Sequence, residues 1–142
     1  MYYTREYLNR AHREIDTIFR VLFPEHGMAV REEQIMLCHK MLDNLLGRNI
    51  ALCDAGVGIG KTYAYLVACV LMRRYAAAMG GGRLCDNRPV VISTSSVALQ
   101  DAIIGEYIPF LSRIFLENRI IPKPIRAMVR KGKERFLSLI HI

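Results

Sequence analysis

A glycine-rich octapeptide, set between an apolar run and a long helix-forming segment, constrains the fold of this chain more than any other feature. Residues 55–62 read Ala-Gly-Val-Gly-Ile-Gly-Lys-Thr. Residues 49–53 before them read Asn-Ile-Ala-Leu-Cys, and residues 62–79 after them are rich in Ala, Leu and Tyr. The apolar run has the length of a buried strand and the later segment has the length of a helix. The predicted local order is therefore strand, glycine-rich loop and helix.

That order is typical of a loop that binds phosphate. Glycines let the backbone take positive φ values and approach an anion closely, and the N–H groups at the start of a helix point at it. As catalytic candidates, Lys61 is expected to contact the β- and γ-phosphates of a nucleotide, and the Thr62 hydroxyl to ligate the bridging Mg²⁺. An ordinary glycine-rich turn entering a helix is the plain structural alternative. The nucleotide-binding candidates in the loop are Ala55, Gly56, Val57, Gly58, Ile59, Gly60, Lys61 and Thr62.

The bulk composition is that of one folded domain. The chain has 142 residues, of which 52% are hydrophobic and 23% charged, so we expect a modest core and no extended disorder. Arg73 and Arg74 interrupt the most apolar segment before it reaches the length of a membrane span. With no signal segment at its start, the chain is expected in the cytoplasm and without a membrane partner. Its four cysteines and four histidines are scattered, so no metal cluster is predicted.

Positive charge concentrates near the end of the chain. The formal net charge is +7, and most of it lies in residues 119–135, where a single acidic residue, Glu134, stands among the basic ones. Such a stretch favours a polyanionic partner, most plausibly a nucleic acid backbone. The alternative is a solvated run of charge. The basic residues of this stretch are Arg119, Lys123, Arg126, Arg130, Lys131, Lys133 and Arg135.

Hydrophobic periodicity places further helices and strands around the loop. Strands that alternate with helices indicate an α/β fold with a parallel sheet. Helices are expected over about 4–23, 31–46, 62–79 and 96–117, the last broken near Pro109, and strands over 49–53, 89–93 and 125–129.

Four segments occur in an order that resembles the DinG/XPD-like superfamily 2 DNA helicases, over about residues 28–136. The glycine-rich loop is the specific one among them, and it matches the A-x-x-G-x-G-K-T form found in many superfamily 2 helicases. The four segments are Arg31-x-x-Gln34, Asp54 with the loop at 55–62, Ser93-Thr94-Ser95-Ser96-x-x-Leu99-Gln100, and Val129-Arg130-Lys131-Gly132-Lys133.

The resemblance implies an architecture. It is that of an α/β, RecA-like P-loop NTPase fold with an incomplete parallel sheet flanked by helices. Residues 1–28 would be an N-terminal helical extension and residues 29–136 part of a RecA-like helicase ATP-binding domain. Residues 137–142 resemble the translation of a transposon adapter end used in sequencing libraries, so they are expected to be a non-native tail. The chain would then be an N-terminal fragment of the first RecA-like domain of a larger enzyme.

The resemblance also implies a function for that enzyme. ATP hydrolysis would drive translocation on DNA and its unwinding, with ATP and Mg²⁺ as cofactors and single-stranded DNA as the expected partner. Arg31 and Gln34 would lie by the adenine. The chain shows no acidic Mg²⁺ motif after its second predicted strand, so we expect it to bind ATP without hydrolysing it. The nucleic-acid-binding candidates are Ser93, Thr94, Ser95, Ser96, Gln100, Lys131 and Lys133.

The chain departs from the family pattern at several positions. Asp54 stands where Glu is usual and Ser96 where Thr is usual, and both changes are chemically conservative. Ser138 stands near where the first cysteine of an iron–sulfur cluster is expected, and serine is a poor cluster ligand. A cluster is therefore expected only in a full-length parent and not in this chain.

Two other classes of function remain open from the residues alone. A small-molecule or nucleotide kinase also uses such a loop, although its first residue is normally Gly where this chain has Ala55. A non-catalytic nucleic-acid-binding module would explain the basic stretch but leaves the glycine-rich loop without a purpose. The oligomeric state is not indicated by the sequence.

Overall fold

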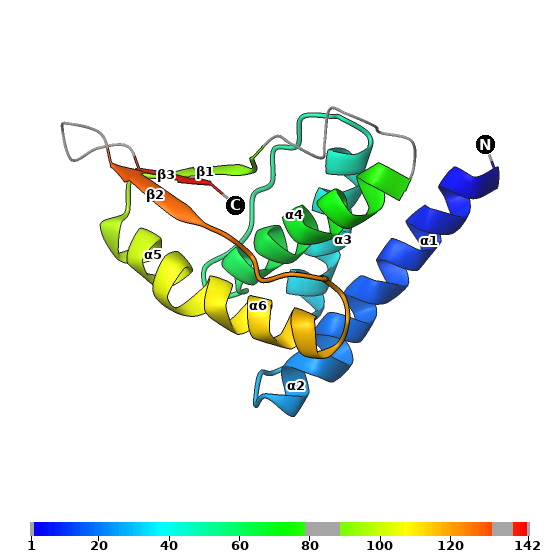
Figure 1. The fold of residues 1–142 in the computed structure, drawn as a ribbon, viewed down its shortest axis with the longest axis horizontal. Helices are drawn as coiled ribbons and strands as arrows, with labels where there is room; N and C mark the ends of the chain where they lie inside the picture. The colour runs from blue at the N-terminus through cyan, green and yellow to red at the C-terminus, as the bar shows by residue number, and fades with distance from the viewer. Residues whose placement is uncertain (1, 79–88, 132–137, 142) are drawn as a thin grey trace. The chain divides into compact units, whose positions relative to one another are not determined.

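The computed structural model describes residues 2–78, 89–131 and 138–141. The chain divides into two compact units, Met1–Asn87 and Arg88–Ile142, whose elements are labelled in Figure 1. The predicted division into residues 1–28, 29–136 and 137–142 stays a prediction. In the described part of the chain, the helices are all too short or too polar to cross a membrane.

The first unit is helical, and its helices confirm the predicted ones. Its elements are α1 (Tyr2–Thr17), a π-helical turn η1 (Ile18–Leu22), α2 (Phe23–Glu25), α3 (Glu32–Leu46) and α4 (Lys61–Ala78). Gly27, with φ of +83°, follows α2, and Gly47 caps the end of α3. Gly47 lies just after the predicted end of its helix at about residue 46, whereas the first helical segment continues to Glu25, two residues past its predicted end.

The core of this unit forms because each helix carries an apolar stripe. Helix α3 packs along α4, and α1 contacts both. The ring of Phe23 lies against Phe19 edge to face, with centroids 4.9 Å apart, and 5.3 Å from the ring of Tyr63 on α4. Aromatic contacts of this kind join the end of the first helical segment to the start of α4. The fully buried residues here are Ala11, Ile15, Ile18, Cys38, Leu42, Ala64, Val67, Ala68 and Leu71.

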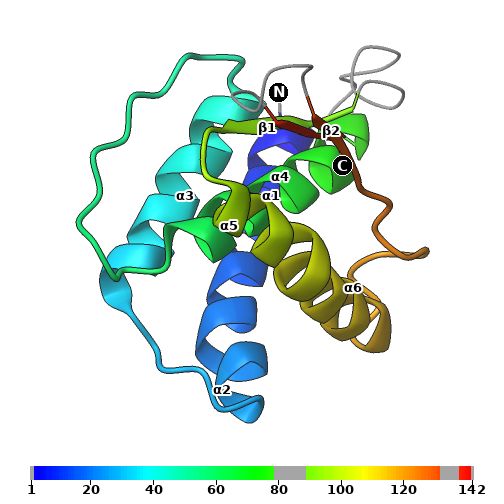
Figure 2. The same cartoon turned by 90° about the vertical axis from the view of Figure 1, so that its left-hand side faces the viewer.

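The predicted strand at residues 49–53 is wrong. This stretch belongs to an irregular segment that runs back along α3 from its end to the start of α4 (Figure 2). Ile50 is 94% exposed and Leu52 is 97% exposed. A strand exists only when a neighbour satisfies its backbone donors and acceptors. The described residues of this unit hold no strand to pair with it, so an apolar sequence alone did not produce one.

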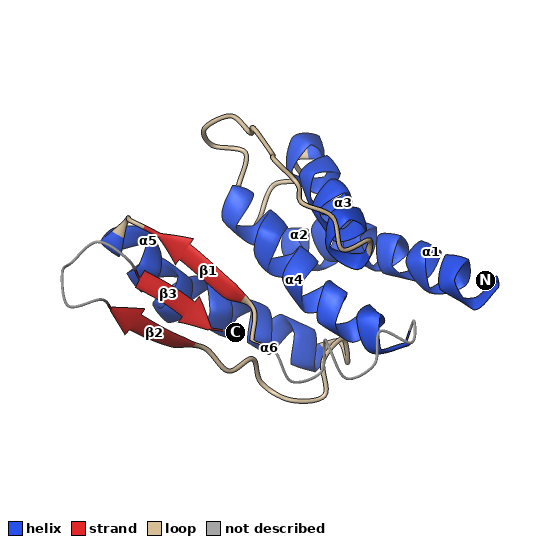
Figure 3. Ribbon diagram, turned by 90° about the horizontal axis from the view of Figure 1, so that it is seen from above, coloured by secondary structure: helices blue, strands red, loops and turns tan. Residues whose placement is uncertain are grey.

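The second unit combines helices with a small sheet. It contains β1 (Val91–Thr94), α5 (Val97–Ala102), a π-helical turn η3 (Ile103–Tyr107), α6 (Ile108–Glu117), β2 (Met128–Lys131) and β3 (Ser138–His141). The strands lie in the order β1-β3-β2 (Figure 3). Strand β3 pairs with both neighbours, with His141 opposite Val91 on one side and Met128 on the other.

The predicted parallel sheet is therefore wrong, because both pairings are antiparallel. Parallel neighbours need a crossover connection of about a dozen residues or more, and only residues 132–137, which lie outside the described residues, separate β2 from β3. The predicted strands at 89–93 and 125–129 do form, as β1 and β2 with shifted ends. Strand β3 arises in residues 137–142, the stretch expected to be a non-native tail.

Pro109 does not break its helix, contrary to prediction. Helical residues continue without interruption from Val97 to Glu117, and Pro109 occupies the first turn of α6. The turn before it is the π-helical η3. A π-helical turn changes the hydrogen-bond spacing from i→i−4 to i→i−5, so the missing N–H of proline is accommodated within a continuous helix.

Candidate nucleotide-binding site

The glycine-rich loop leads directly into the start of α4. Helix α4 begins at Lys61, so Lys61 and Thr62 are its first two residues. The first N–H groups of a helix have no partner within the helix and face outward along its axis. Gly58 and Gly60 have φ of +85° and +81°, values that glycine adopts without strain. The loop therefore presents a backbone of the kind that surrounds an anion.

The Lys61 side chain folds back onto the loop. Its Nζ donates a 2.7 Å hydrogen bond to the carbonyl oxygen of Ala55, the first residue of the octapeptide. An ammonium group has three N–H donors, so this contact is compatible with a phosphate oxygen as a second partner. Lys61 is exposed and Thr62 is half-buried. Both candidate catalytic residues thus lie where the loop joins α4, and their roles toward a nucleotide and Mg²⁺ stay predictions.

Two side chains at the start of α3 donate hydrogen bonds to carbonyl oxygens of the loop. Gln34 Nε2 donates to the carbonyl oxygen of Gly60 at 2.8 Å, and Arg31 Nη1 donates to the carbonyl oxygen of Gly58. Gln34 is only 4% exposed, so its amide is committed to this contact. The sequence placed Arg31 and Gln34 beside the adenine of ATP. In the structure their partners are loop carbonyls, and the adenine contact stays a prediction.

The Gln34 amide also leaves no room for a side chain at residue 60. A Cβ atom added to Gly60 would lie 2.1 Å from Gln34 Nε2, well inside van der Waals contact. Gly56 and Gly58, by contrast, have nothing within 4 Å of such an atom. The three glycines of the loop therefore differ, because Gly60 combines a positive φ with a side-chain neighbour, Gln34, whose amide would have to move for a larger residue.

An ion pair fixes the start of α3, where Arg31 and Gln34 lie. Arg20 donates to both carboxylate oxygens of Glu32, at 2.6 and 2.9 Å. The hydrogen bond from Arg20 holds the pKa of the Glu32 carboxyl below its ordinary value, and the hydrogen bond to Glu32 raises the pKa of Arg20. Both side chains are exposed, so the pair contributes little to stability.

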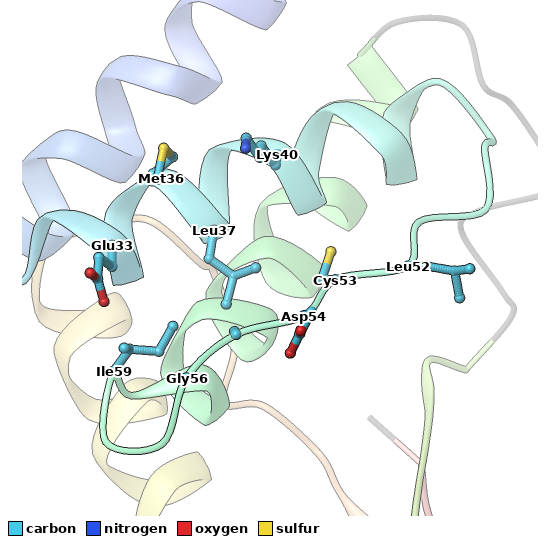
Figure 4. Close-up of a pocket in the computed structure, with 10 residues that line it drawn as sticks. Glu33, Met36, Leu37, Lys40, Leu52, Cys53, Asp54, Gly56 and Ile59 are labelled. Atoms are coloured by element: carbon cyan, nitrogen blue, oxygen red, sulfur yellow. The ribbon is translucent and has the colours of Figure 1, made fainter.

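A cavity of about 480 Å³ lies between α3 and residues 52–59. Figure 4 shows Leu37 pointing from α3 toward this segment, with Glu33, Met36 and Lys40 on neighbouring turns of the helix. The volume falls within the range of small-molecule sites. It adjoins the loop and was not indicated by any sequence motif. The loop-side lining residues are Leu52, Cys53, Asp54, Ala55, Gly56 and Ile59.

The serine-rich candidates for nucleic acid lie in the second unit, at the end of β1. Ser96 is the N-cap of α5, and its Oγ accepts a hydrogen bond from Leu99 N at 3.2 Å. Gln100 is 3% exposed and donates to the carbonyl oxygen of Thr94 at 3.1 Å. The ordinary capping role is thus present at Ser96. Contact with nucleic acid stays a prediction for this segment.

The remaining nucleic-acid candidates are exposed serines and basic residues of the second unit. Ser93 and Ser95 are exposed, so their side chains are accessible to a partner. Lys131 ends β2, and Lys133 lies outside the described residues. Of the basic stretch, Arg119, Lys123, Arg126 and Arg130 are exposed, as a surface for a polyanion requires.

Two of the four histidines, which are scattered along the sequence, come together in the structure. His12 on α1 and His39 on α3 lie side by side, with their Nδ1 atoms 2.6 Å apart. Each follows a fully buried core residue, Ala11 or Cys38, and no sequence motif indicated that the two histidines would meet. Among the described residues, no group of three or more His, Cys, Asp or Glu side chains could hold a metal ion.

Comparison with known proteins supports the family resemblance that was predicted from the sequence, over most of the chain. It is 31% identical over 113 residues to the 3'-5' exonuclease DinG of Bacillus subtilis, which covers 80% of this chain and 10% of that protein. It is 35% identical over 83 residues to the ATP-dependent DNA helicase DinG of Photobacterium profundum, covering 58% of the chain and 10% of the relative. A Staphylococcus aureus protein named 3'-5' exonuclease DinG is 29% identical over 113 residues, 80% of this chain and 11% of its own.

These relatives are DNA-processing enzymes, and the chain is related in sequence to that class. More narrowly, it is DinG-like over about four fifths of its length, which confirms the resemblance predicted from its motifs. The chain spans about a tenth of the length of the curated relatives it matches. No known protein-family profile and no solved structure matches it.

Proposed function

We propose that this chain binds ATP with Mg²⁺ through residues 55–62, as part of the ATP-binding domain of a DinG-like, ATP-dependent DNA helicase. The observation that carries the proposal is the glycine-rich loop at the start of α4, with Lys61 and Thr62 as the first residues of that helix. The name of the Photobacterium relative, ATP-dependent DNA helicase, supports the same function.

The residues of the loop at 55–62 fit a nucleoside triphosphate. Gly58 and Gly60 turn the loop through positive φ values, and the α4 N-terminus directs backbone N–H groups at the loop, where a phosphate is favoured. Lys61 would neutralise charge on the β- and γ-phosphates and Thr62 would hold the Mg²⁺. When bound, ATP supplies the transferable γ-phosphoryl group. Arg31 and Gln34 would act indirectly, because their hydrogen bonds keep the carbonyl oxygens of Gly58 and Gly60 turned away from the anion.

In the longer protein we infer a RecA-like motor domain that acts on single-stranded DNA. The exposed Ser93 and Ser95, together with Lys131 and Lys133, would contact its backbone, because hydroxyl and ammonium groups bind phosphate oxygens without reading sequence. An iron–sulfur cluster, if the parent has one, would be held by residues beyond those of this chain. ATP binding without turnover is the activity we assign to the chain itself.

The test of ATP binding is a titration of a fluorescent ATP analogue with Mg²⁺ against the wild-type chain and Lys61→Ala. Charge-assisted hydrogen bonds contribute about 2 kcal/mol, so the affinity should fall about thirtyfold. Lys123→Ala is the matched control, because Lys123 is an exposed lysine in the other unit. Equal affinities of wild type and Lys61→Ala would remove the phosphate-loop assignment.

Coupling between nucleotide and DNA separates this function from its alternatives. The anisotropy of a labelled single-stranded oligonucleotide should report a different affinity with ATP and Mg²⁺ than without them. A kinase should bind ATP but not the oligonucleotide, and a nucleic-acid-binding module should bind the oligonucleotide with no response to ATP. Of these three classes, only a helicase domain couples ATP binding to DNA affinity.

A further inference from the structure

Two histidines from different helices meet edge to edge in the first unit. His12 lies on α1 and His39 on α3, and the distance between their Nδ1 atoms is 2.6 Å. Their rings are nearly parallel, at 28°, with centroids 4.8 Å apart. Two nitrogen atoms this close must share a hydrogen, since two lone pairs would repel each other at that distance.

A carboxylate closes the pair at each end. His12 Nε2 lies 2.6 Å from Asp43 Oδ1, and His39 Nε2 lies 3.1 Å from Asp16 Oδ1. The carboxylates are on the opposite helices, Asp43 on α3 and Asp16 on α1. The four side chains therefore form three hydrogen bonds in a row, each of which crosses between α1 and α3.

A count of ring protons shows which charge state of the two imidazoles supplies one hydrogen to each of the three hydrogen bonds. An ionised carboxylate only accepts, so both Nε2 atoms must carry a hydrogen, and one hydrogen must lie between the two Nδ1 atoms. That makes three ring protons on two imidazoles, which is one imidazolium and one neutral ring. With two protons, one of the three bonds has no hydrogen. With four protons, two N–H groups face each other.

The surrounding charges favour a single positive charge at this place. Asp16 also contacts Arg20, with Nε at 3.5 Å, and Arg20 pairs with Glu32 on α3. From α4, Arg74 and Tyr75 both contact Glu14 of α1. The two carboxylates that touch the imidazoles directly thus favour positive charge on the pair. The facing Nδ1 atoms limit that charge to one, because a second imidazolium would place two N–H groups against each other.

We propose that His12 and His39 form a pH-sensitive clasp that fastens α1 to α3 by sharing one proton. Histidine is the side chain whose charge ordinarily changes between pH 5 and 8. Acid would add a proton and separate the rings, and alkali would remove the shared proton and leave a bond unmade. Because α3 also carries Gln34, which holds the phosphate loop, the clasp joins α1 to the helix behind the candidate site. The clasp itself does not depend on nucleotide binding.

The test is a double-mutant cycle measured at several pH values. Urea unfolding of the 142-residue chain would be followed for wild type, His12→Gln, His39→Gln and the double variant at pH 5, 7 and 9. We expect the coupling between the two positions to multiply the folding equilibrium constant about tenfold near neutrality and less than twofold at both ends. Coupling that is constant across the range, or absent throughout, would overturn the clasp.

A second measurement keeps the proposal testable if a variant fails to fold. In wild-type chain labelled with ¹⁵N-histidine, nuclear magnetic resonance counts the ring N–H groups directly. We expect three for the pair His12 and His39 near neutrality, with the shared hydrogen far downfield. Two or four ring protons at that pH would contradict the proposal. His26, which follows α2 and is not part of the pair, serves as the internal reference.

Discussion

Gln34 donates a 2.8 Å hydrogen bond from Nε2 to the carbonyl oxygen of Gly60, 26 residues further along the chain. The contact joins the first turn of α3 to the last residue before α4, and it is part-buried, with Gln34 itself buried. It fixes which way one peptide group of the phosphate loop faces. A carbonyl oxygen that turned toward an anion would repel it, so under the proposed function this hydrogen bond orients the loop for phosphate.

Gln34→Ala should therefore weaken nucleotide binding without removing any direct contact to phosphate. The Gly60 carbonyl would lose its buried donor, at a cost of about 1–3 kcal/mol to folding. We expect the affinity for the ATP analogue to fall about five- to tenfold. The control is Asn118→Ala, which removes an amide-to-carbonyl bond of similar length, 2.9 Å to Ile114. That control should lower stability but not affinity. An unchanged affinity in Gln34→Ala would show that the bond does not position the loop.

Gly60→Ala should disrupt the loop more than any other glycine replacement. Alanine is strained at φ of +81°, and its Cβ would press on Gln34 Nε2 at 2.1 Å. Together these effects should cost about 2–4 kcal/mol in unfolding free energy. Gly56→Ala is the matched control, because it meets nothing within 4 Å, and its cost should stay below about 0.5 kcal/mol.

The clash and the strain at residue 60 can be separated experimentally. The double variant Gly60→Ala with Gln34→Ala removes the clash and keeps the positive φ. It should therefore be less destabilised than the sum of the two single variants. Strict additivity of the two free energies would mean that Gln34 does not approach residue 60.

Tyr75→Phe tests how α1 is attached to α4. Tyr75 Oη donates a 2.6 Å hydrogen bond to Glu14 Oε2, and Tyr75 is 4% exposed. Loss of this bond should cost about 1–2 kcal/mol, measurable as a decrease of a few degrees in Tm. If Tm is unchanged, the Glu14 carboxylate is satisfied by Arg74 alone, at 3.3 Å.

The same variant has a predicted pH signature. Burial, together with the hydrogen bond to Glu14, raises the pKa of Tyr75 above its ordinary value of 10.0. Above pH 10 the unfolded chain therefore releases this proton more readily than the folded chain, so stability is lost as the pH rises. The wild-type free energy of unfolding should fall more steeply between pH 10 and 11 than that of Tyr75→Phe. Parallel curves would contradict the assignment.

Glu32→Gln should affect stability only where Glu32 is ionised in the folded chain. The hydrogen bond from Arg20 lowers the pKa of Glu32 in the folded chain below its ordinary value of 4.5. The ion pair therefore stabilises the fold above pH 4.5, and this stabilisation is lost as the pH falls through the lowered pKa of the folded chain. The difference in Tm between wild type and Glu32→Gln should be small, shrink in acid and shrink in added salt. Glu33→Gln, also in the first turn of α3, controls for the helix dipole. A salt-independent difference would argue against an ion pair.

Local sequence was sufficient for the helices and the loop. Helix periodicity placed α1 to α3 closely, because an amphipathic stripe is a property of residues that are near one another in the chain. The position of residues 55–62 as a loop just before α4 was predicted for the same reason, and their binding of phosphate stays a prediction. The adenine and nucleic-acid contacts assigned by resemblance remain predictions.

Pairing between distant segments could not be predicted in this way. Ile50 and Leu52 have strand-like neighbours in sequence but no ladder partner, and β3 takes the central place between β1 and β2 in an antiparallel sheet. The meeting of His12 with His39 and of Gln34 with Gly60 likewise depends on how α1, α3 and α4 pack. The helices were determined by the sequence alone, because they depend on contacts between residues a few positions apart. The strand partners and the interhelical hydrogen bonds were decided only by the tertiary structure, because these depend on the packing that buries the core of the whole unit.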